Sequence, residues 1–356
     1  MRTTRSNRLL VQAAFAMGIV SALPGCGGGA GSSGGGDDTG TLSASLTDAA
    51  IDEVVAVNLR VLGLRLRMQG AGEDAWVDVD LRHDDGSALE VNLLDYQNGE
   101  TFTLFEDERV PAGLYEHARL VLEAPAQTPI QCRGQDPMEG SHVEEIGGGL
   151  VPVFVPSAAE AGVRLVSPFR VPLNGSAEVI IDFDLRQSLF VPAAFTGECY
   201  FVRPAFRVEA IENTGRIAGE VDVALLDGSN GLCSDDDPAT GNSVYVYRGA
   251  DAIPGDINGD ENATTAAPYA TAAVEFDPLA GNSGEGSYMV SFLPADDYTV
   301  AFTCRGDEER LPNDDSQNDD ERLAVDSLDF QLPQNASVVA QQTSVVTFTA
   351  DDANEG

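Results

Sequence analysis

Residues 55–66, VAVNLRVLGLRL, decide the fold class of this chain. Val55, Val57, Leu59 and Val61 alternate with Ala56, Asn58, Arg60 and Leu62, and Leu64 and Leu66 continue the apolar set. A period of two is typical of a β-strand that buries one face. The alternation recurs at residues 77–81 and 179–184, where Asp78 and Asp80, and then Asp182 and Asp184, are expected on the solvent face. The chain is therefore predicted to be all-β.

Short turn signals separate these runs, namely DDG at 84–86, QNG at 97–99 and PAG at 111–113. The one helix predicted from the pattern is short, at 157–161. A second series of strands begins near Gly215. We therefore expect two antiparallel β-sandwich-type domains, at residues 41–212 and 213–356.

The N-terminus has the pattern of a secretory signal. Arg2, Arg5 and Arg8 precede an apolar run at 9–23, which is too short to span a bilayer. The run ends in LPGC at 23–26, which resembles a bacterial lipobox. The alternative is an ordinary secretory signal that happens to be followed by a cysteine.

The lipobox resemblance implies that residues 1–25 are removed and that Cys26 is acylated. Several acyl chains hold a protein on a membrane stably. Residues 26–40 then form a Gly/Ser-rich tether, because they offer no side chains for a core. Gly27 is not the aspartate that, in the familiar sorting rule, retains lipoproteins at the inner membrane, so we expect the outer membrane of a two-membrane bacterium.

Composition excludes several classes of function. The 356 residues carry a net charge of −38, which disfavours nucleic acid and anionic lipid headgroups as partners. All 20 basic residues are arginine. Without lysine, Schiff-base catalysis and a phosphate-loop lysine are excluded.

The cysteines agree with export to an oxidising compartment. With Cys26 acylated, four cysteines remain, and the expected domain boundary favours the pairs Cys132–Cys199 and Cys233–Cys304. A thiolate metal site is the alternative, but no C-x-x-C pair or nearby histidine supports it.

An ordered set of short motifs resembles a family of secreted bacterial lipoprotein domains without an assigned function. The motifs are SLTDA at 45–49, LLDYQNG at 93–99, PAGLY at 111–115, VPS at 155–157, DFD at 182–184 and RPAFR at 203–207. Ala50 stands where proline is usual. The resemblance implies a β fold and an extracytoplasmic location, and it supplies no catalytic residues.

The second series of strands resembles a prealbumin-like or carboxypeptidase-regulatory-like β-sandwich. The resemblance rests on IAGEV at 217–221 and on YMVSFLPADDYTV at 288–300, where Asp296 replaces the usual glycine. It implies a spacer or binding module.

One acidic segment places oxygen ligands at alternate positions. Asp256, Asn258 and Asp260 have the spacing of a calcium loop, although Glu261 stands where the loop needs glycine. The alternatives are a calcium site completed by neighbouring acidic segments and a solvated acidic loop.

No catalytic arrangement is predicted, because neighbouring carboxylates on one strand face do not flank a sugar cleft. Trp76, the single tryptophan, is expected to pack on a sheet. We therefore expect a lipid-anchored envelope protein that is not an enzyme and acts as a binding or structural module. Its partners would be the membrane and an extracellular glycan or envelope protein. The alternatives are a polysaccharide-binding protein, with or without calcium, and an acid-residue hydrolase.

Overall fold

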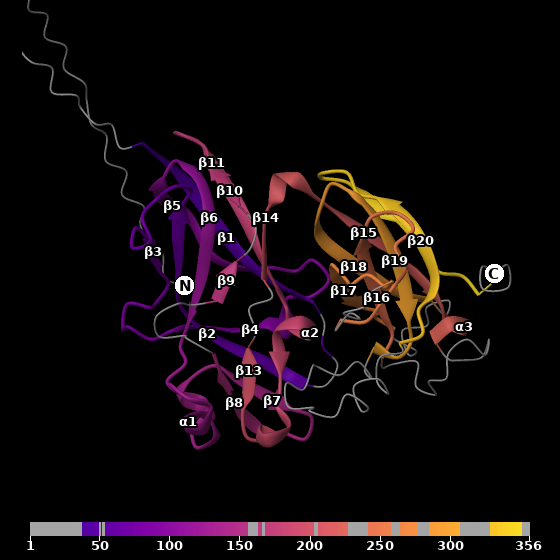
Figure 1. Ribbon diagram of the computed structural model, residues 1–356, viewed down its shortest axis with the longest axis horizontal. Helices are drawn as coiled ribbons and strands as arrows, with labels where there is room; N and C mark the ends of the chain where they lie inside the picture. The colour runs from indigo at the N-terminus through magenta and orange to yellow at the C-terminus, as the bar shows by residue number, and fades with distance from the viewer. Residues whose placement is uncertain are drawn as a thin grey trace, which may run out of the picture. The chain divides into compact units, whose positions relative to one another are not determined.

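The computed structural model consists mainly of β-strands, as the sequence predicts (Figure 1). It describes residues 38–49, 51, 54–155, 163–165, 168–202, 206–226, 241–257, 264–276, 285–306 and 328–350. In this described part the α-helices are one-turn elements, namely α1 (Pro129–Arg133), α2 (Leu185–Ser188) and α3 (Val223–Leu226). No helix among these residues is long and apolar enough to cross a membrane. The helix expected at 157–161 lies outside the described residues.

The first sheet has four strands in the order β14-β11-β1-β5. They are β14 (Phe206–Ala210), β11 (Ser176–Asp184), β1 (Thr39–Ala49) and β5 (Phe102–Pro111). Strand β1 pairs with β11 in parallel and with β5 in antiparallel orientation.

The second sheet has ten strands built around β2 (Val54–Met68). Its main path is β10-β6-β2-β7-β8-β13-β12, with β3 and β4 also paired to β2 and β9 paired to β6. The strands are β3 (Val77–Asp80), β4 (Leu89–Asn92), β6 (Gly113–Leu122), β7 (His142–Glu145), β8 (Leu150–Phe154), β9 (Val163–Leu165), β10 (Phe169–Val171), β12 (Leu189–Phe190) and β13 (Tyr200–Val202). A 3₁₀ turn, η1 (Leu93–Asp95), follows β4.

Strand β2 follows the predicted alternation except at its bulges. Val57, Leu59 and Val61 are buried, but Val55 is 53% exposed. The register of β2 against β7 shifts between Val54 and Ala56, which reverses the facing of the strand's first residues. The register of β2 against β6 also shifts, between Val61 and Gly63. After this bulge the buried positions of β2 continue at Leu64 and Leu66.

One hydrophobic core contains side chains from both of these sheets. The rings of Phe183 in β11 and Phe206 in β14 lie edge to face with centroids 3.9 Å apart, and Leu46 of β1 and Leu59 of β2 are fully buried. Burial of such side chains contributes about 1.5–3 kcal/mol each, which makes this core the main source of stability for the first two sheets.

Two further sheets follow from residue 214 onward. One has the order β18-β15-β21 and the other the order β17-β16-β19-β20. Their strands are β15 (Thr214–Asp222), β16 (Ser243–Arg248), β17 (Ala270–Ala273), β18 (Glu285–Pro294), β19 (Asp297–Thr303), β20 (Gln331–Ser337) and β21 (Thr343–Val345). A second core cluster includes Ile217, Val244 and Phe302.

Both halves of the chain use the same local device at a turn. The hydroxyl of Tyr115 donates to the carbonyl of Pro111 at 2.7 Å, and the hydroxyl of Tyr298 donates to the carbonyl of Pro294 at 2.9 Å. Each tyrosine ring is buried while its hydroxyl satisfies a backbone oxygen four residues earlier. The two proline–tyrosine motifs found in the sequence thus form equivalent contacts.

The strand directions differ in part from the antiparallel prediction. In the described part of the chain, three strand pairs are parallel: β1 with β11, β8 with β13, and β15 with β21. A period of two is the same for parallel and antiparallel strands, so the sequence pattern carries no information about direction.

Among the described residues, no strand pair joins a strand before residue 212 to one after residue 213. The expected domain boundary stays a prediction, since residues Asp37–Gly356 form one compact unit.

Candidate functional site

Two oppositely charged residues of the first sheet form an ion pair beneath residues of the later strands. Asp182 of β11 and Arg207 of β14 are directly opposite in the antiparallel register, and Arg207 Nη2 contacts Asp182 Oδ2. Asp182 is 5% exposed, and the Arg207 side chain is 15% exposed. Arg207 Nη1 also donates to the carbonyl of Tyr269 at 2.8 Å, and its guanidinium lies 4.3 Å from the Tyr269 ring centroid. Arg207 therefore links the first sheet to the segment that precedes β17.

Asp184, two residues after Asp182, is also buried and caps helix α2. Its Oδ1 accepts from the backbone N–H of Gln187 at 3.1 Å, and its Oδ2 accepts from the Gln187 side-chain amide at 2.8 Å. Burial raises the pKa of Asp184 to about 6, against an opposing effect of the positive charge of Arg207. Burial opposes the charge on Arg207 as well, but the nearby Asp182 and the other negative partners raise the pKa of Arg207.

Helix α2 contributes a second buried arginine. Arg186 Nη1 donates to the hydroxyl of Tyr245 at 3.0 Å and to the carbonyl of Gly306 at 3.2 Å. Arg186 Nη2 donates to Ser243 Oγ at 2.9 Å. Arg186 therefore links α2 to β16 and to the segment that follows β19 by charge-assisted hydrogen bonds.

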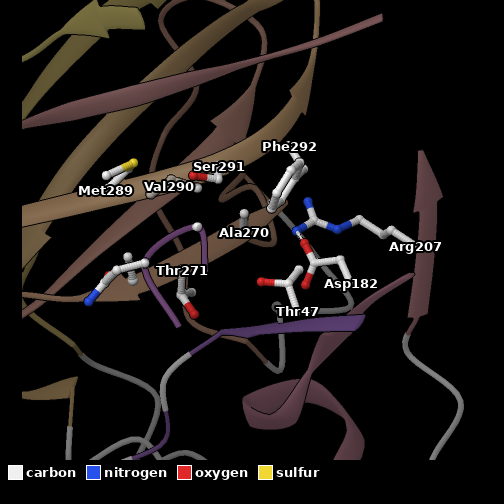
Figure 2. Close-up of a pocket in the computed structure, with 12 residues that line it drawn as sticks. Thr47, Asp182, Arg207, Ala270, Thr271, Met289, Val290, Ser291 and Phe292 are labelled. Atoms are coloured by element: carbon white, nitrogen blue, oxygen red, sulfur yellow. Dashed lines mark hydrogen bonds and ion pairs between the residues drawn. The ribbon is translucent and has the colours of Figure 1, made fainter. Parts of the chain in front are cut away.

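A small cavity of about 20 Å³ lies beside Asp182 and Arg207. Figure 2 shows Thr47 and Asp182 on one side and Thr271 with Met289–Phe292 on the other. Three buried polar atoms near this cavity have no hydrogen-bond partner: Asp182 Oδ1, Arg207 Nε and Thr271 Oγ1. The volume is sufficient for about one water molecule, which needs 10–15 Å³ and two to four polar partners.

Residues from four of the sequence motifs meet at this cavity. Thr47 belongs to SLTDA, Asn98 and Gly99 to LLDYQNG, Asp182 to DFD and Arg207 to RPAFR. The contact is close, because a Cβ on Gly99 would lie 2.6 Å from Ser291 Oγ. The motifs therefore converge on a place where residues 270–272 and 289–292 cover the first sheet.

The cavity lies beside buried charges, and its volume is too small for a substrate larger than water. The sequence analysis expects Asp182 and Asp184 on a solvent face, and this expectation is wrong. Both lie on the face opposite Val179 and Ile181, as predicted, but later strands cover that face, and Asp184 is only 3% exposed. The pattern of one strand does not show what a distant segment packs against it.

Two of the expected cysteines are joined in a disulfide. Cys132 of α1 and Cys199 form the bond, with Cα atoms 5.9 Å apart, as the sequence analysis expects. They lie in a separate cluster with Phe154, Phe190 and Phe201. Cys304 is buried, whereas Cys233 lies outside the described residues, so the second pairing stays a prediction.

The other expected site residues lie mostly outside the described part of the chain. Cys26, Asn258 and Asp260 are among the residues left undescribed, and of the calcium set only Asp256 is placed. The charge of Asp256 adds to the effect of burial in raising the pKa of Tyr247. In the described ranges, no three histidine, cysteine or carboxylate side chains group as metal ligands. The calcium site therefore stays untested.

Asp78 and Asp80 lie on an exposed face, as predicted. Asp78 accepts from Arg65 Nε at 2.7 Å, and Asp80 Oδ2 lies 3.5 Å from Arg82 Nη1. Trp76, just before β3, is half-buried and lies against the guanidinium groups of arginines. The sequence analysis did not identify these arginines, or Arg186 and Arg207, as site residues. The RPAFR motif was the available signal for Arg207.

Part of the sequence matches a known family model. Residues 39–204 match the Domain of unknown function (DUF4382). The matched region contains Thr47, Asn98, Gly99 and Asp182 of the cavity, and the family description assigns it no activity. No curated protein matches the chain.

Solved structures give only weak similarity. A leucine-rich repeat protein from Bacteroides thetaiotaomicron is 8% identical with a TM-score of 0.21, covering 88% of this chain and 26% of that one. The Bacillus anthracis TIE protein is 10% identical with a TM-score of 0.15, covering 87% and 34%. A fimbrial protein from Bacteroides ovatus is 8% identical with a TM-score of 0.17, covering 88% and 49%. The chain thus spans only a minor part of the first two proteins, and these scores establish no common fold.

Proposed function

We propose that this protein is a non-catalytic module of the bacterial cell envelope, anchored at the outer membrane through acylated Cys26. The anchor is supported by the basic start, the apolar run and the LPGC sequence at 23–26. The high net negative charge suits a solvated extracytoplasmic surface.

One observation carries the non-catalytic, structural part of the proposal. Asp182, Asp184 and Arg186 are the most deeply buried carboxylates and arginine of the described chain. Arg186 donates directly to Tyr245, Ser243 and Gly306. Asp182 and Asp184 hold Arg207 and Gln187, whose side chains donate to the carbonyls of Tyr269 and Pro268. The cavity beside Asp182 has a volume of about 20 Å³, which leaves room for about one water molecule. Such a site acts as a structural joint that holds successive β units in a fixed arrangement.

The joint is tested by the cooperativity of unfolding. We expect the mature chain to unfold in one calorimetric transition, because buried contacts couple the two sets of sheets. Arg186→Ala and Arg207→Ala should separate this transition into two. The exposed Arg109 in β5 provides a matched control, and Arg109→Ala should leave one transition. Two transitions in the wild-type protein would show that no such coupling exists.

The anchor is tested independently by mass spectrometry of the mature protein from its native membrane. We expect diacylglycerol on the sulfur of Cys26 and a fatty acid on its amino group. Cys26→Ala should abolish processing at this position. An unmodified Cys26 in the mature wild-type protein would exclude the lipid anchor.

Recognition of an extracellular polysaccharide is the second candidate function. A specific feature favours it, namely the arginines that surround Trp76 on the outer face of the ten-stranded sheet.

A further inference from the structure

Three arginines gather around the only tryptophan of the chain. The guanidinium carbons of Arg65, Arg67 and Arg119 lie 5.3, 5.0 and 4.5 Å from the centroid of the Trp76 ring. Arg65 and Arg67 come from β2 and Arg119 from β6, and all four side chains are partly exposed. We call this group the Arg–Trp surface.

The strand register brings like charges together at this surface. Arg65 of β2 is directly opposite Arg119 of β6, and Arg67 is directly opposite His117. Like charges at directly opposed positions destabilise a sheet. In a chain with a net charge of −38, three arginines on adjoining strands concentrate positive charge at this surface, although Arg65 is paired with Asp78.

The ring and a few polar contacts hold the guanidinium groups in place. Stacking on the negative face of the Trp76 ring offsets part of the repulsion between the guanidinium groups. Arg65 Nε donates to Asp78, and Arg67 Nη1 donates to the carbonyl of Glu73 at 3.3 Å. Each of these two arginines has further N–H groups, because a guanidinium carries five.

A groove of about 300 Å³ adjoins the Arg–Trp surface and shares Arg65 with it. Leu62 and Val121 provide apolar surface in this groove, and Asp78, Asp80 and Arg82 provide polar groups. This volume is at the lower end of the range for small-molecule sites. Apolar surface together with carboxylates suits a ligand that presents both C–H groups and hydroxyls.

We propose that the Arg–Trp surface and its groove bind a sugar unit that carries a carboxylate, such as a uronic acid in an extracellular polysaccharide. The guanidinium forks match a carboxylate in bidentate geometry, and Asp78 and Asp80 accept hydrogen bonds from hydroxyls. At physiological ionic strength the repulsion from the rest of the chain is screened beyond about 8 Å, so short-range contacts decide the binding.

Binding of a carboxylated sugar rests on the polysaccharide-binding function proposed above and names its ligand. It does not depend on acylation of Cys26 or on the contacts around Asp182. Its test uses the mature chain, residues 26–356, purified in detergent. Binding to polygalacturonate is compared with binding to fully methyl-esterified polygalacturonate by isothermal titration calorimetry. We expect binding to the charged polymer and at least about tenfold weaker binding to the ester, because a charge-assisted contact is lost.

Variants locate the site on the protein. Arg67→Ala and Arg119→Ala should each weaken polygalacturonate binding about tenfold or more, and Arg67→Lys should restore it only in part because lysine lacks the bidentate fork. Arg109→Ala removes an exposed arginine from the other sheet and should change affinity less than about twofold. Circular dichroism of each variant, including the milder Arg67→Lys, separates lost binding from lost folding.

Three results would overturn the assignment. They are no binding of polygalacturonate by the folded wild-type protein, equal weakening by Arg109→Ala, and equally tight binding of DNA or dextran sulfate, which would indicate a general polyanion surface. None of these results bears on acylation of Cys26 or on the unfolding of the joint, so the two proposals fail separately.

Discussion

Asp182 and Arg207 are cross-strand partners whose charges meet where the first sheet is covered by later strands. Removing two charges from water costs free energy that their attraction only partly offsets. The pair is therefore better suited to fixing one arrangement than to adding net stability. The hydrogen bond from Arg207 to the carbonyl of Tyr269 extends this arrangement to the following half of the chain.

Breaking this pair from one side should be strongly destabilising. Arg207→Met leaves the Asp182 carboxylate buried without its partner, which should lower the free energy of unfolding by about 3–5 kcal/mol. Urea denaturation at pH 7 measures the change. The double variant Asp182→Val/Arg207→Met should lower the free energy of unfolding by less than Arg207→Met alone, because no uncompensated charge remains buried.

An exposed ion pair gives the matched comparison. Asp78→Ala removes the partner of Arg65, whose side chain is 33% exposed, and should cost no more than about 1 kcal/mol. An equal decrease in the free energy of unfolding for Asp78→Ala and Arg207→Met would contradict the expectation that the buried pair is more sensitive than the exposed pair.

Asp184 predicts a pH dependence of stability. Burial raises its pKa in the folded protein to about 6, from an ordinary value of 3.8. Between these two values the folded state binds the proton more tightly than the unfolded state does. The contribution of Asp184 to stability is therefore fully present below about pH 4 and is lost as the pH rises through 6. The difference between the two pKa values corresponds to about 3 kcal/mol in the free energy of unfolding.

Asp184→Asn isolates this effect from that of the other carboxylates, since asparagine also caps a helix. We expect the stability of the variant relative to wild type to increase by about 3 kcal/mol between pH 4 and pH 7. Urea denaturation at four pH values across this range provides the measurement. A difference that is constant with pH would show that Asp184 titrates near its ordinary value.

The sequence was sufficient to predict the strands but not their partners. Val57, Leu59 and Val61 are buried as the alternation predicts, because a half-buried strand imposes a period of two. Val55 breaks the pattern through a bulge, which depends on the neighbouring strand β7. The parallel pairing of β1 with β11 joins residues more than a hundred positions apart. The local alternation of side chains therefore does not predict this pairing.

The candidate site was visible in the sequence only as unexplained motifs. DFD and RPAFR contain Asp182 and Arg207, but the alternation alone assigned Asp182 to solvent. Its burial depends on Thr271 and on Met289–Phe292, which belong to later strands. The Arg–Trp surface likewise depends on the register of β2 with β6, which sets Arg65 against Arg119.

The disulfide Cys132–Cys199 should contribute substantially to stability. It joins residues 67 positions apart, and closing a loop of this size in the unfolded chain corresponds to about 4 kcal/mol in the chain-entropy model. Cys132→Ala/Cys199→Ala should lower the free energy of unfolding by up to this amount in guanidinium titrations.

The expected pair Cys233–Cys304 is tested by peptide mapping without reductant. We expect one peptide that joins these two cysteines and a second that joins Cys132 to Cys199. A peptide linking Cys304 to Cys132 or Cys199 would contradict both pairings and the boundary expected near residue 213.

Calcium should stabilise the acidic later half of the chain if Asp256, Asn258 and Asp260 form a site. Carboxylates held close together repel each other, and a bound divalent cation offsets that repulsion. An ion that binds only the folded state raises the melting temperature with its concentration. Thermal unfolding of the mature chain in calcium, in magnesium and in sodium at matched ionic strength distinguishes binding from charge screening.

The variants Asp256→Asn and Asp260→Asn assign any calcium effect to this loop. Each keeps an oxygen at its position but removes a charge, so the calcium-dependent rise in melting temperature should fall without a large change in sodium. Asp296→Asn, at an exposed carboxylate that pairs with Arg248 at 3.7 Å, serves as the control and should keep the full calcium effect. Coincident melting curves in the three salts would identify the segment as a solvated acidic loop, because screening alone does not distinguish calcium from sodium at equal ionic strength.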